Sequence, residues 1–302
     1  MRFGRVLVTG SAGLLGRYVI AELKPHCEPC GFDLTPTEAI PHSVGDMTDA
    51  RAVRNACKGV DAVVHIAAMP NIWAGSPSQI MSVNVMGTWN LLNAAEEAGV
   101  RRVVVTSSDS VVGFTVREGR LIPPSYLPID ERHPLRPTDP YALSKKLVEE
   151  MGRSFVDRGK LEVLAIRPVY ILYPQMECEV LARAQDPNGY KGPAAGGRQP
   201  AGGGPAWHYV DPRDVARAFR CALEVPQMGF DVFFISAATT LAPEPTLDRL
   251  STFSGRVTEV RRPEVYTSNP YAPLYDLSHA RDVLGFEARY DRRELLKMVS
   301  SR

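Results

Sequence analysis

The sequence predicts an α/β fold in which helices cover both faces of a parallel sheet. Short runs rich in Val, Ile and Ala are apolar throughout, without the alternation of a half-exposed strand. Stretches with helical periodicity separate these runs, as the crossovers of a parallel sheet require. A glycine-rich turn joins the first run to the first helix. Together these observations predict a Rossmann-type, doubly wound sheet followed by a small C-terminal α/β domain.

The elements of the sheet follow one another in regular alternation. The predicted strands cover residues 4–9, 29–33, 61–67, 101–107 and 161–167. The predicted helices between them cover residues 14–24, 49–57, 79–98 and 141–157. No internal repeat interrupts this order.

The predicted nucleotide-binding Rossmann domain covers residues 1–168. Segment 206–240 is expected to return to its sheet, because WHYVDPRDVARAFRCALE resembles a strand and a helix and a further strand follows at 230–236. The substrate-binding part is then formed by residues 169–205 and 241–302, the latter with helices at 245–253 and 277–284.

Segment 189–205 differs from the rest of the chain in composition. It holds seven Gly and three Pro among 17 residues. Such a stretch buries too little apolar surface to offset the entropy of ordering it. Two interpretations are open: a disordered surface loop, or a lid that substrate orders.

Composition excludes several classes of partner. A net charge of +1 gives no electrostatic footprint for nucleic acid or an acidic membrane, and no apolar run reaches the ~18 residues that span a bilayer. Met1 leads directly into a strand, so we expect no signal peptide and a cytoplasmic protein. Five cysteines favour a reducing compartment. Cys27 and Cys30 form C-E-P-C without a second ligand pair, so we expect turn residues and no metal site.

The turn VLVTGSAGLLG carries glycines at positions 10, 13 and 16, between an apolar strand and an amphipathic helix. Gly10 would permit the tight turn, Gly13 a close approach of pyrophosphate, and Gly16 close packing of helix on strand. Unpaired amides of the helix N-terminus favour the same phosphate. Asp33, at the end of the second strand, would bind the ribose hydroxyls and repel a 2′-phosphate. No Arg or Lys lies between Asp33 and Gly45, so NAD is predicted over NADP.

The stretch PYALSK places Tyr141 and Lys145 on one face of a helix, four residues apart. A tyrosine that exchanges protons near neutral pH needs a lowered pKa, which an adjacent ammonium would favour. Ser108, in VVVTSSDS at a strand end, could orient a substrate alcohol or carbonyl. We therefore predict that Ser108, Tyr141 and Lys145 are the catalytic residues.

Nearly the whole chain resembles the extended short-chain dehydrogenase/reductase family, in particular its NAD-dependent epimerase/dehydratase branch. The matching stretches are VTGSAGLLG, GDMTD, VVHIAA, NVMGTWNLLNAAEEAGVRRVVVTSS, PYALSKKLVEE, IRP and DVARA. The resemblance implies a small-molecule substrate and, commonly, a homodimer formed through a helix bundle. By this resemblance Tyr141 is the catalytic acid/base. Lys145 lowers the pKa of Tyr141 and binds the nicotinamide ribose, and Ser108 polarises the substrate. The implied cofactor-binding residues are Gly10, Gly13, Leu14, Leu15, Gly16, Asp33, Asp46, Met47, Ala67, Ala68, Asn84, Tyr141 and Lys145.

Two departures from the family pattern bear on the substrate. Family 4,6-dehydratases carry an Asp-Glu pair after the catalytic hydroxyl, whereas Asp109 is followed here by Ser110, so the base is missing. Nucleotide-sugar members read R-x-x-N-x-Y-G-P, but RPVYILYP has Tyr170 at the Asn position and Tyr173 at the Gly position. A substrate smaller than a nucleotide sugar is therefore a second possibility, such as a free sugar, a sugar acid or another secondary alcohol.

Further residues could line the pocket. Asp109, Tyr170, Trp207 and His208 are substrate candidates, and aromatic faces suit the apolar side of a sugar. His65 is expected to be a hydrogen-bonded structural residue. Arg167 and Arg213 could bind an anionic substrate or pair with nearby carboxylates.

The predicted function is therefore NAD-dependent hydride transfer at a secondary alcohol or ketone of a sugar or sugar-like substrate. The motifs serve a dehydrogenase and an epimerase alike, and a nucleotide-sugar 4-epimerase is the alternative. A catalytically silent NAD-binding regulatory protein is the alternative from another class.

Overall fold

The computed structural model describes residues 2–37, 40–114, 122–186, 207–254 and 259–296. Within them one parallel sheet has the strand order β3-β2-β1-β4-β5-β6-β7. Its strands are β1 (Arg5–Thr9), β2 (Glu28–Asp33), β3 (His42–Val44), β4 (Ala62–His65), β5 (Arg102–Thr106), β6 (Glu162–Pro168) and β7 (Phe230–Ile235). The order reverses between β1 and β4, and ligands of open α/β sheets bind at such a switch point. The predicted doubly wound sheet is confirmed; the short strand β3 was not predicted.

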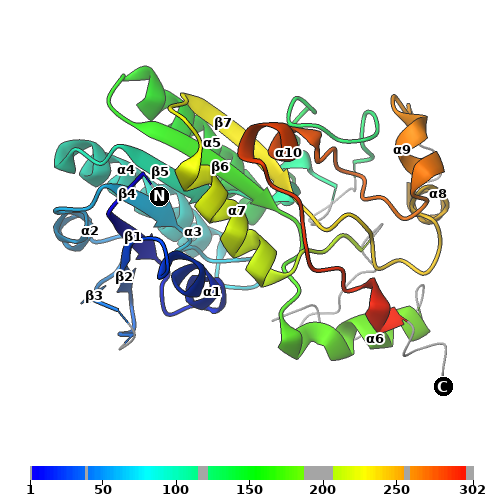
Figure 1. Ribbon diagram of the computed structural model, residues 1–302, viewed down its shortest axis with the longest axis horizontal. Helices are drawn as coiled ribbons and strands as arrows, with labels where there is room; N and C mark the ends of the chain where they lie inside the picture. The colour runs from blue at the N-terminus through cyan, green and yellow to red at the C-terminus, as the bar shows by residue number, and fades with distance from the viewer. Residues whose placement is uncertain (1, 38–39, 115–121, 187–206, 255–258, 297–302) are drawn as a thin grey trace.

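Helices form a layer on each face of this sheet (Figure 1). On one face α1 (Leu14–Leu23) packs against α7 (Pro212–Glu224), and α10 (Ser278–Leu284) contacts both α7 and β7. On the other face lie α2 (Ala50–Ala56), α4 (Gly87–Ala98) and α5 (Pro140–Asp157). In the described residues no helix combines the length and apolar character needed to cross a membrane.

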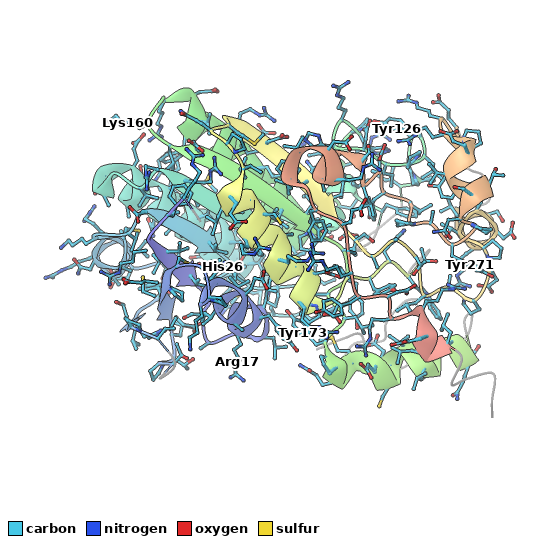
Figure 2. The ribbon with its side chains drawn as sticks, viewed as in Figure 1. Arg17, His26, Tyr126, Lys160, Tyr173 and Tyr271 are labelled. Atoms are coloured by element: carbon cyan, nitrogen blue, oxygen red, sulfur yellow. The ribbon has the colours of Figure 1, made fainter. Side chains whose placement is uncertain are left out.

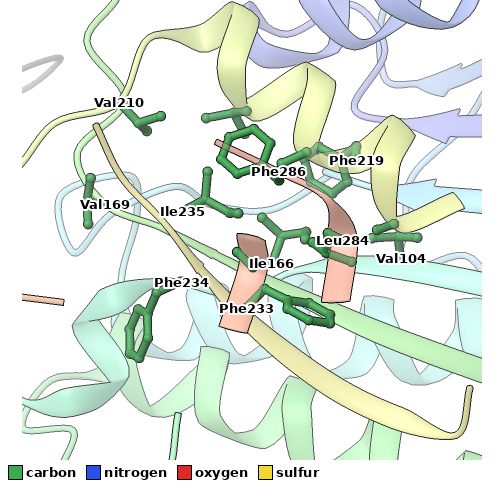
Figure 3. Packing of buried hydrophobic residues seen from close by; sticks show 14 of the residues in the cluster. Val104, Ile166, Val169, Val210, Phe219, Phe233, Phe234, Ile235, Leu284 and Phe286 are labelled. Carbon is green, nitrogen blue, oxygen red and sulfur yellow. The ribbon is translucent and has the colours of Figure 1, made fainter. Parts of the chain in front are cut away.

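The two cores divide the strand side chains between them. In β1, Val6 and Val8 belong to the core under α1 and α7, whereas Leu7 belongs to the opposite core. Figure 3 shows the first core, where Phe219 of α7 and Phe286 meet Ile166 of β6. Successive residues of a strand point to opposite faces, so burial on both faces explains the continuous apolar runs.

The predicted helix 79–98 is interrupted. It begins as α3 (Pro77–Met81) with a capping box at its start, passes through a π-helical turn (Ser82–Met86) and continues as α4. Asn84 lies in the π-helical turn, where it accepts a hydrogen bond from the Met69 amide and donates to Ser144 Oγ. These long-range bonds favour the wide turn, and π-helical turns often occur at functional sites.

The C-terminal part has its own small core, built around Leu172, Trp207 and Tyr209. Its helices are α6 (Glu177–Gln185), α8 (Thr246–Ser254) and α9 (Pro263–Ser268), with short 3₁₀ turns at Pro174–Met176 and Arg293–Leu296. Helices α8 and α10 confirm two predictions; α6 and α9 were not predicted.

The strand predicted just before α7 is wrong. Val210 makes a single parallel bridge to Ile171 outside the sheet. The Val210 amide donates to the Tyr170 carbonyl and the Val210 carbonyl accepts from the Leu172 amide, so this backbone pairs with the segment after β6 instead of the sheet. The next residue, Asp211, caps α7 by accepting from the Arg213 amide. Segment 189–205, for which a lid or a disordered loop was expected, lies outside the described residues.

Candidate active site

The glycine turn between β1 and α1 has little room for side chains. Gly10 has φ of 71°, and a Cβ on it would lie 2.8 Å from the Ala67 nitrogen. A Cβ on Gly16 would lie 2.2 Å from the Gly10 carbonyl oxygen. A Cβ on Gly13 would approach only that oxygen, at 3.2 Å. Gly10 therefore serves the turn and Gly16 the helix packing, while the face at Gly13 is open.

The first turn of α1 is free of side-chain caps. Gly13 is its N-cap residue and makes no side-chain hydrogen bond. The first amides of a helix have no partner within the helix, so they are available to an anion. Leu14 beside them is exposed, whereas Leu15 is buried in the core under α1. Leu15 thus anchors the helix, and Leu14 is the one of the two that an incoming ligand can reach.

Asp33 lies at the C-terminal end of β2, facing the glycine turn. Its Oδ2 accepts a hydrogen bond from the Ala12 amide at 3.0 Å, and its Oδ1 accepts one from Thr35 at 3.3 Å. Asp46 is exposed and accepts from the amide and the hydroxyl of Thr48, both at 2.8 Å. The carboxylate of Asp33 is thus held beside the cradle that the glycines form.

Of the remaining predicted cofactor residues, two are buried. Met47 packs in the core under α4, where a Cβ on Gly87 would lie 2.8 Å from its Cβ. Asn84 is held by Met69 and Ser144, as described above. Ala67 and Ala68 follow β4, which ends two residues earlier than predicted, and both are partly exposed.

His65 is a structural residue, as predicted. Its Nε2 lies 2.9 Å from Thr88 Oγ1, and its Nδ1 lies 2.7 Å from Thr9 Oγ1. Thr88 donates its own proton to the Asn84 carbonyl oxygen, so it must accept from His65 Nε2. Nδ1 is then the acceptor, and the ring is neutral. Burial, together with the charge of Lys145, lowers the pKa of His65 to about 3.

Helix α5 carries the predicted acid/base pair. Asp139 caps the helix by accepting from the Ala142 amide, and Pro140 occupies its first turn. Lys145 is buried and donates to the Thr106 carbonyl oxygen at 2.8 Å, with Nζ 5.8 Å from the centre of the Tyr141 ring. Burial lowers the pKa of Lys145 to about 8.

The pKa of Tyr141 moves in the direction opposite to the expected one. Burial raises it well above its ordinary value, and the charges of Asp109 and Asp139 raise it further. A hydrogen bond with Ser108 lowers it in part. Desolvation is the largest of these effects on the pKa of Tyr141.

Ser108 ends the segment after β5 and begins a 3₁₀ turn (Asp109–Val112). Its hydroxyl accepts from the Ser110 amide at 3.1 Å and donates to Asp109 Oδ1 at 3.3 Å. Burial raises the pKa of Asp109 to about 6, against the hydrogen bonds from Tyr275 and Ser108 that lower it. Ser108, Asp109, Tyr141 and Lys145 are therefore gathered at the carboxyl end of β5.

The two candidate anion-binding arginines both pair with carboxylates of the chain. Arg167 is buried and holds Glu149 through two hydrogen bonds of 2.7 Å. Arg213 binds Asp211 through hydrogen bonds of 2.8 and 2.7 Å. Pairing with carboxylates, the second of the two alternatives, is therefore what the structure shows for both guanidinium groups.

The aromatic candidates differ in place. His208 is buried, accepts from the Leu274 amide at 3.0 Å and lies 4.9 Å from the Tyr275 ring, which in turn reaches Asp109. Trp207 packs in the C-terminal core, with the Arg249 guanidinium 5.6 Å from its ring. Of these two, His208 is the residue that a chain of contacts joins to the reacting groups.

The two tyrosines that depart from the nucleotide-sugar pattern make contacts of their own. Tyr170 donates to Glu179 Oε2 at 3.4 Å. Tyr173, labelled in Figure 2, is buried with its ring 6.2 Å from that of Tyr18 in α1. Tyr173 thus fills space between α1 and the C-terminal part.

Two polar residues of the site were not predicted. Glu149 accepts from Ser107 Oγ at 2.5 Å and lies four residues after Lys145, a helical spacing that could have indicated it. Tyr275 donates to Asp109 Oδ2 at 2.9 Å. It lies in no motif, so no local signal could have found it.

Known proteins resemble this chain in sequence and in structure. A model of the "NAD dependent epimerase/dehydratase family" matches residues 6–235. The chain is 32% identical over 171 residues to a uronate dehydrogenase of Pseudomonas putida, which covers 55% of this chain and 60% of that protein. The match thus spans less than two thirds of that relative's own length.

Two further likenesses add to this. The chain is 32% identical over 173 residues to an L-arabinose 1-dehydrogenase (NAD(P)(+)) of Haloferax volcanii, covering 56% of this chain and 67% of that protein. The structure is similar to that of a short-chain dehydrogenase/reductase superfamily protein from Agrobacterium tumefaciens with bound NAD. For that pair the TM-score is 0.69 and the identity 26%, with 98% of this chain and 96% of the other covered.

Proposed function

The chain belongs to the NAD dependent epimerase/dehydratase family and NAD is its cofactor; on this premise we propose that it is an oxidoreductase acting on a secondary alcohol or ketone of a free sugar or sugar-like substrate. The observation that supports this most directly is the gathering of Ser108, Tyr141 and Lys145 beside the switch point of the sheet. In this proposal residues 1–168 and 206–240 bind NAD, and the C-terminal remainder binds the substrate.

The residues present fit NAD. Gly13 leaves an open backbone face beside the uncapped start of α1, and Asp33 presents a carboxylate next to it. Gly10, Gly13 and Gly16 with the amides of Leu14 and Leu15 would hold the pyrophosphate, and Asp33 the ribose. Asp46, Met47, Ala67, Ala68 and Asn84 complete the proposed cofactor-binding set. Oxidised NAD, when bound, supplies a hydride acceptor and a positive charge.

The chain's own residues would handle the proton and the substrate oxygen. In oxidation Tyr141 takes the proton of the substrate hydroxyl as a phenolate, a form that needs a positive charge beside it because burial raises its pKa, and in reduction the phenol returns the proton. Ser108 would turn its proton from Asp109 Oδ1 to the substrate oxygen. Lys145, fixed on the Thr106 carbonyl, contributes a cation near Tyr141 and a donor for the nicotinamide ribose.

A net dehydrogenase of a free sugar has the best support among the alternatives. The names of two relatives, uronate dehydrogenase and L-arabinose 1-dehydrogenase, denote oxidation of sugars without a nucleotide. Tyr170 and Tyr173 occupy the positions where nucleotide-sugar members of the family carry Asn and Gly, and the Tyr173 ring packs against Tyr18. Both observations favour a small substrate over a nucleotide sugar.

We also propose a cytoplasmic homodimer. Met86 at the end of the π-helical turn, Trp89 of α4 and Leu143 of α5 are exposed apolar side chains on neighbouring elements. Such a patch is typical of a helix-bundle interface. Light scattering after size-exclusion chromatography would measure the mass.

The test is NADH absorbance with NAD⁺ and a panel of aldoses, uronic acids, small secondary alcohols and UDP- or dTDP-sugars. Net NADH with a free sugar is expected. An epimerised nucleotide sugar without net NADH would make the chain an epimerase. NAD binding without any turnover would favour the regulatory protein. Tyr141→Phe should bind NAD normally and lose about 10²- to 10⁴-fold in kcat; unchanged kcat would remove Tyr141 from the mechanism.

A further inference from the structure

The segment that carries Ser108 is held at three points. Lys145 donates a hydrogen bond to the Thr106 carbonyl, Glu149 accepts one from the Ser107 hydroxyl, and Tyr275 donates one to Asp109. The first two partners lie on α5, which also carries Tyr141. Tyr275 comes from the C-terminal part, 166 residues after Asp109. This third point therefore connects the substrate side of the protein to the proposed reacting group.

Tyr275 is rigidly placed. It is 2% exposed, and a parallel bridge joins its backbone to Ile129. Its ring stacks on Phe234, with centroids 4.7 Å apart, and meets the His208 ring edge-on at 4.9 Å. With the ring held on two sides, the hydroxyl has a fixed position from which it reaches Asp109.

One carboxylate links Tyr275 to Ser108. Oδ2 of Asp109 accepts from the Tyr275 hydroxyl at 2.9 Å, and Oδ1 accepts from the Ser108 hydroxyl at 3.3 Å. The Ser108 oxygen also accepts from the Ser110 amide and makes a hydrogen bond with Tyr141, so Oδ1 of Asp109 is one of three groups that fix its position. A rotation of the carboxylate would move the Ser108 oxygen.

We propose that Tyr275 is a positioning residue: by holding the Asp109 carboxylate it fixes the position of the Ser108 oxygen, from which the Ser108 proton can turn from Oδ1 to the substrate oxygen. The C-terminal part thereby sets the geometry of a group in the nucleotide-binding domain. The catalytic consequence rests on the proposed function, whereas the hydrogen bond between Tyr275 and Asp109 does not.

The charges around Asp109 make this bond sensitive to pH. Tyr141 of α5 and the Ser110 amide face Asp109 from its own domain, and Tyr275 faces it from the other part. Arg167 acts on Tyr275 from beyond Phe234, with its guanidinium 5.0 Å from that ring. A hydroxyl donor stabilises the ionised carboxylate, so its removal raises the pKa of Asp109 further above about 6.

The kinetic test compares Tyr275→Phe with Tyr266→Phe. Both changes remove one buried hydroxyl of the C-terminal part, but Tyr266 donates to the Pro273 carbonyl at 3.4 Å instead of to Asp109. With the sugar that wild type oxidises best, Tyr275→Phe should lower kcat about tenfold, with NAD affinity and KM within threefold. The acid limb of its pH profile should move to higher pH. Tyr266→Phe should match wild type; equal kcat and pH profiles for both variants would overturn the proposal.

A second test needs no substrate. Denaturant unfolding of the NAD complex is measured from pH 5 to pH 8. At pH 5 Asp109 is protonated, so Tyr275→Phe should lose little free energy of unfolding. Above pH 6 the wild-type protein is stabilised by the hydrogen bond from Tyr275 to the ionised carboxylate. The ratio of the unfolding constant of Tyr275→Phe to that of wild type should therefore grow about tenfold from pH 5 to pH 8, as expected for a difference of one pKa unit.

Controls separate the two claims. The ratio should stay flat for Tyr266→Phe, and for Tyr275→Phe made in an Asp109→Asn background. A flat ratio for Tyr275→Phe itself would overturn the bond and the positioning role together. If the wild-type protein oxidises no sugar while the ratio for Tyr275→Phe still grows with pH, the proposed function and the catalytic role of Tyr275 are both wrong. The hydrogen bond between Tyr275 and Asp109 is then still supported.

Discussion

Replacing Gly13 and Gly16 by alanine separates the phosphate cradle from helix packing. The Gly16→Ala methyl group would lie 2.2 Å from the Gly10 carbonyl oxygen, 2.8 Å from Ser11 Cα and 2.9 Å from the Ser11 carbonyl carbon. All three atoms are backbone, so no side chain can rotate away and α1 must move from β1. Overpacking costs about 1–3 kcal/mol, and three such contacts indicate the upper end of that range. The helix propensity of alanine returns about 1 kcal/mol.

Gly16→Ala should therefore lose about 2 kcal/mol of folding free energy, or about 3 °C in Tm for a chain of this length. Gly13→Ala should stay within about 0.5 kcal/mol of wild type, because its φ of −68° suits any residue and one contact at 3.2 Å is slight. Its methyl group would, however, stand on the open face where pyrophosphate must approach. We expect NAD affinity to fall at least about tenfold, or about 1.4 kcal/mol.

The assays are thermal unfolding without cofactor and calorimetric titration with NAD. The expected pattern is a lowered Tm for Gly16→Ala and a normal Tm with weakened NAD binding for Gly13→Ala. Wild-type NAD affinity in Gly13→Ala would refute the cradle. A wild-type Tm in Gly16→Ala would refute the packing argument.

Three further changes test other features. Asp33→Ala should weaken NAD and relax discrimination against NADP, because it removes the charge that would repel a 2′-phosphate; unaltered preference in parallel titrations would show that Asp33 does not face the ribose. Stability should fall between pH 7 and pH 5.5 by about 1 kcal/mol for each of His65 and His208, whose folded pKa values near 3 lie below the unfolded value of 6.5, so that the unfolded state takes up the protons. Asp109, whose folded pKa is raised, adds a smaller amount of stability as the pH falls over the same range and so offsets part of this loss. An unchanged urea midpoint would contradict the expected net loss of stability. Arg102→Met should lower the free energy of unfolding by about 3–5 kcal/mol, because this fully buried guanidinium binds Glu162 and four carbonyl oxygens at the end of α7. A loss below about 1 kcal/mol in denaturant unfolding would show that Glu162 and these carbonyl oxygens find other partners.

Local features of the sequence were enough for the sheet and the glycine turn. The strands read as apolar runs because they are buried on both faces, and each run needs only its own residues to show this. Gly10 has a positive φ and Gly16 packs against backbone, and both demands concern neighbours within one turn. The spacing of Tyr141 and Lys145 follows from helix geometry alone. These parts of the site were therefore predictable.

The sequence pattern failed where distant segments compete for the backbone. The helix expected over 79–98 contains a π-helical turn because Asn84 bonds to Met69 and Ser144, which no periodicity reveals. The strand expected before α7 is absent because the backbone of Val210 pairs with Tyr170 and Leu172 outside the sheet. Both differences arise from hydrogen bonds between segments that lie far apart in the sequence.

What the sequence determined by itself is the family of motifs: the parallel sheet, the glycine turn with Asp33, and the helix that pairs Tyr141 with Lys145. Each of these motifs is a pattern of residues close together in the sequence, so its signal is local. Only the tertiary structure decided that Arg167 pairs with Glu149, that burial raises the pKa of Tyr141, and that Tyr275 reaches Asp109. Burial and long-range hydrogen bonds are properties of the packed chain, and they exist only once residues far apart in sequence are brought together.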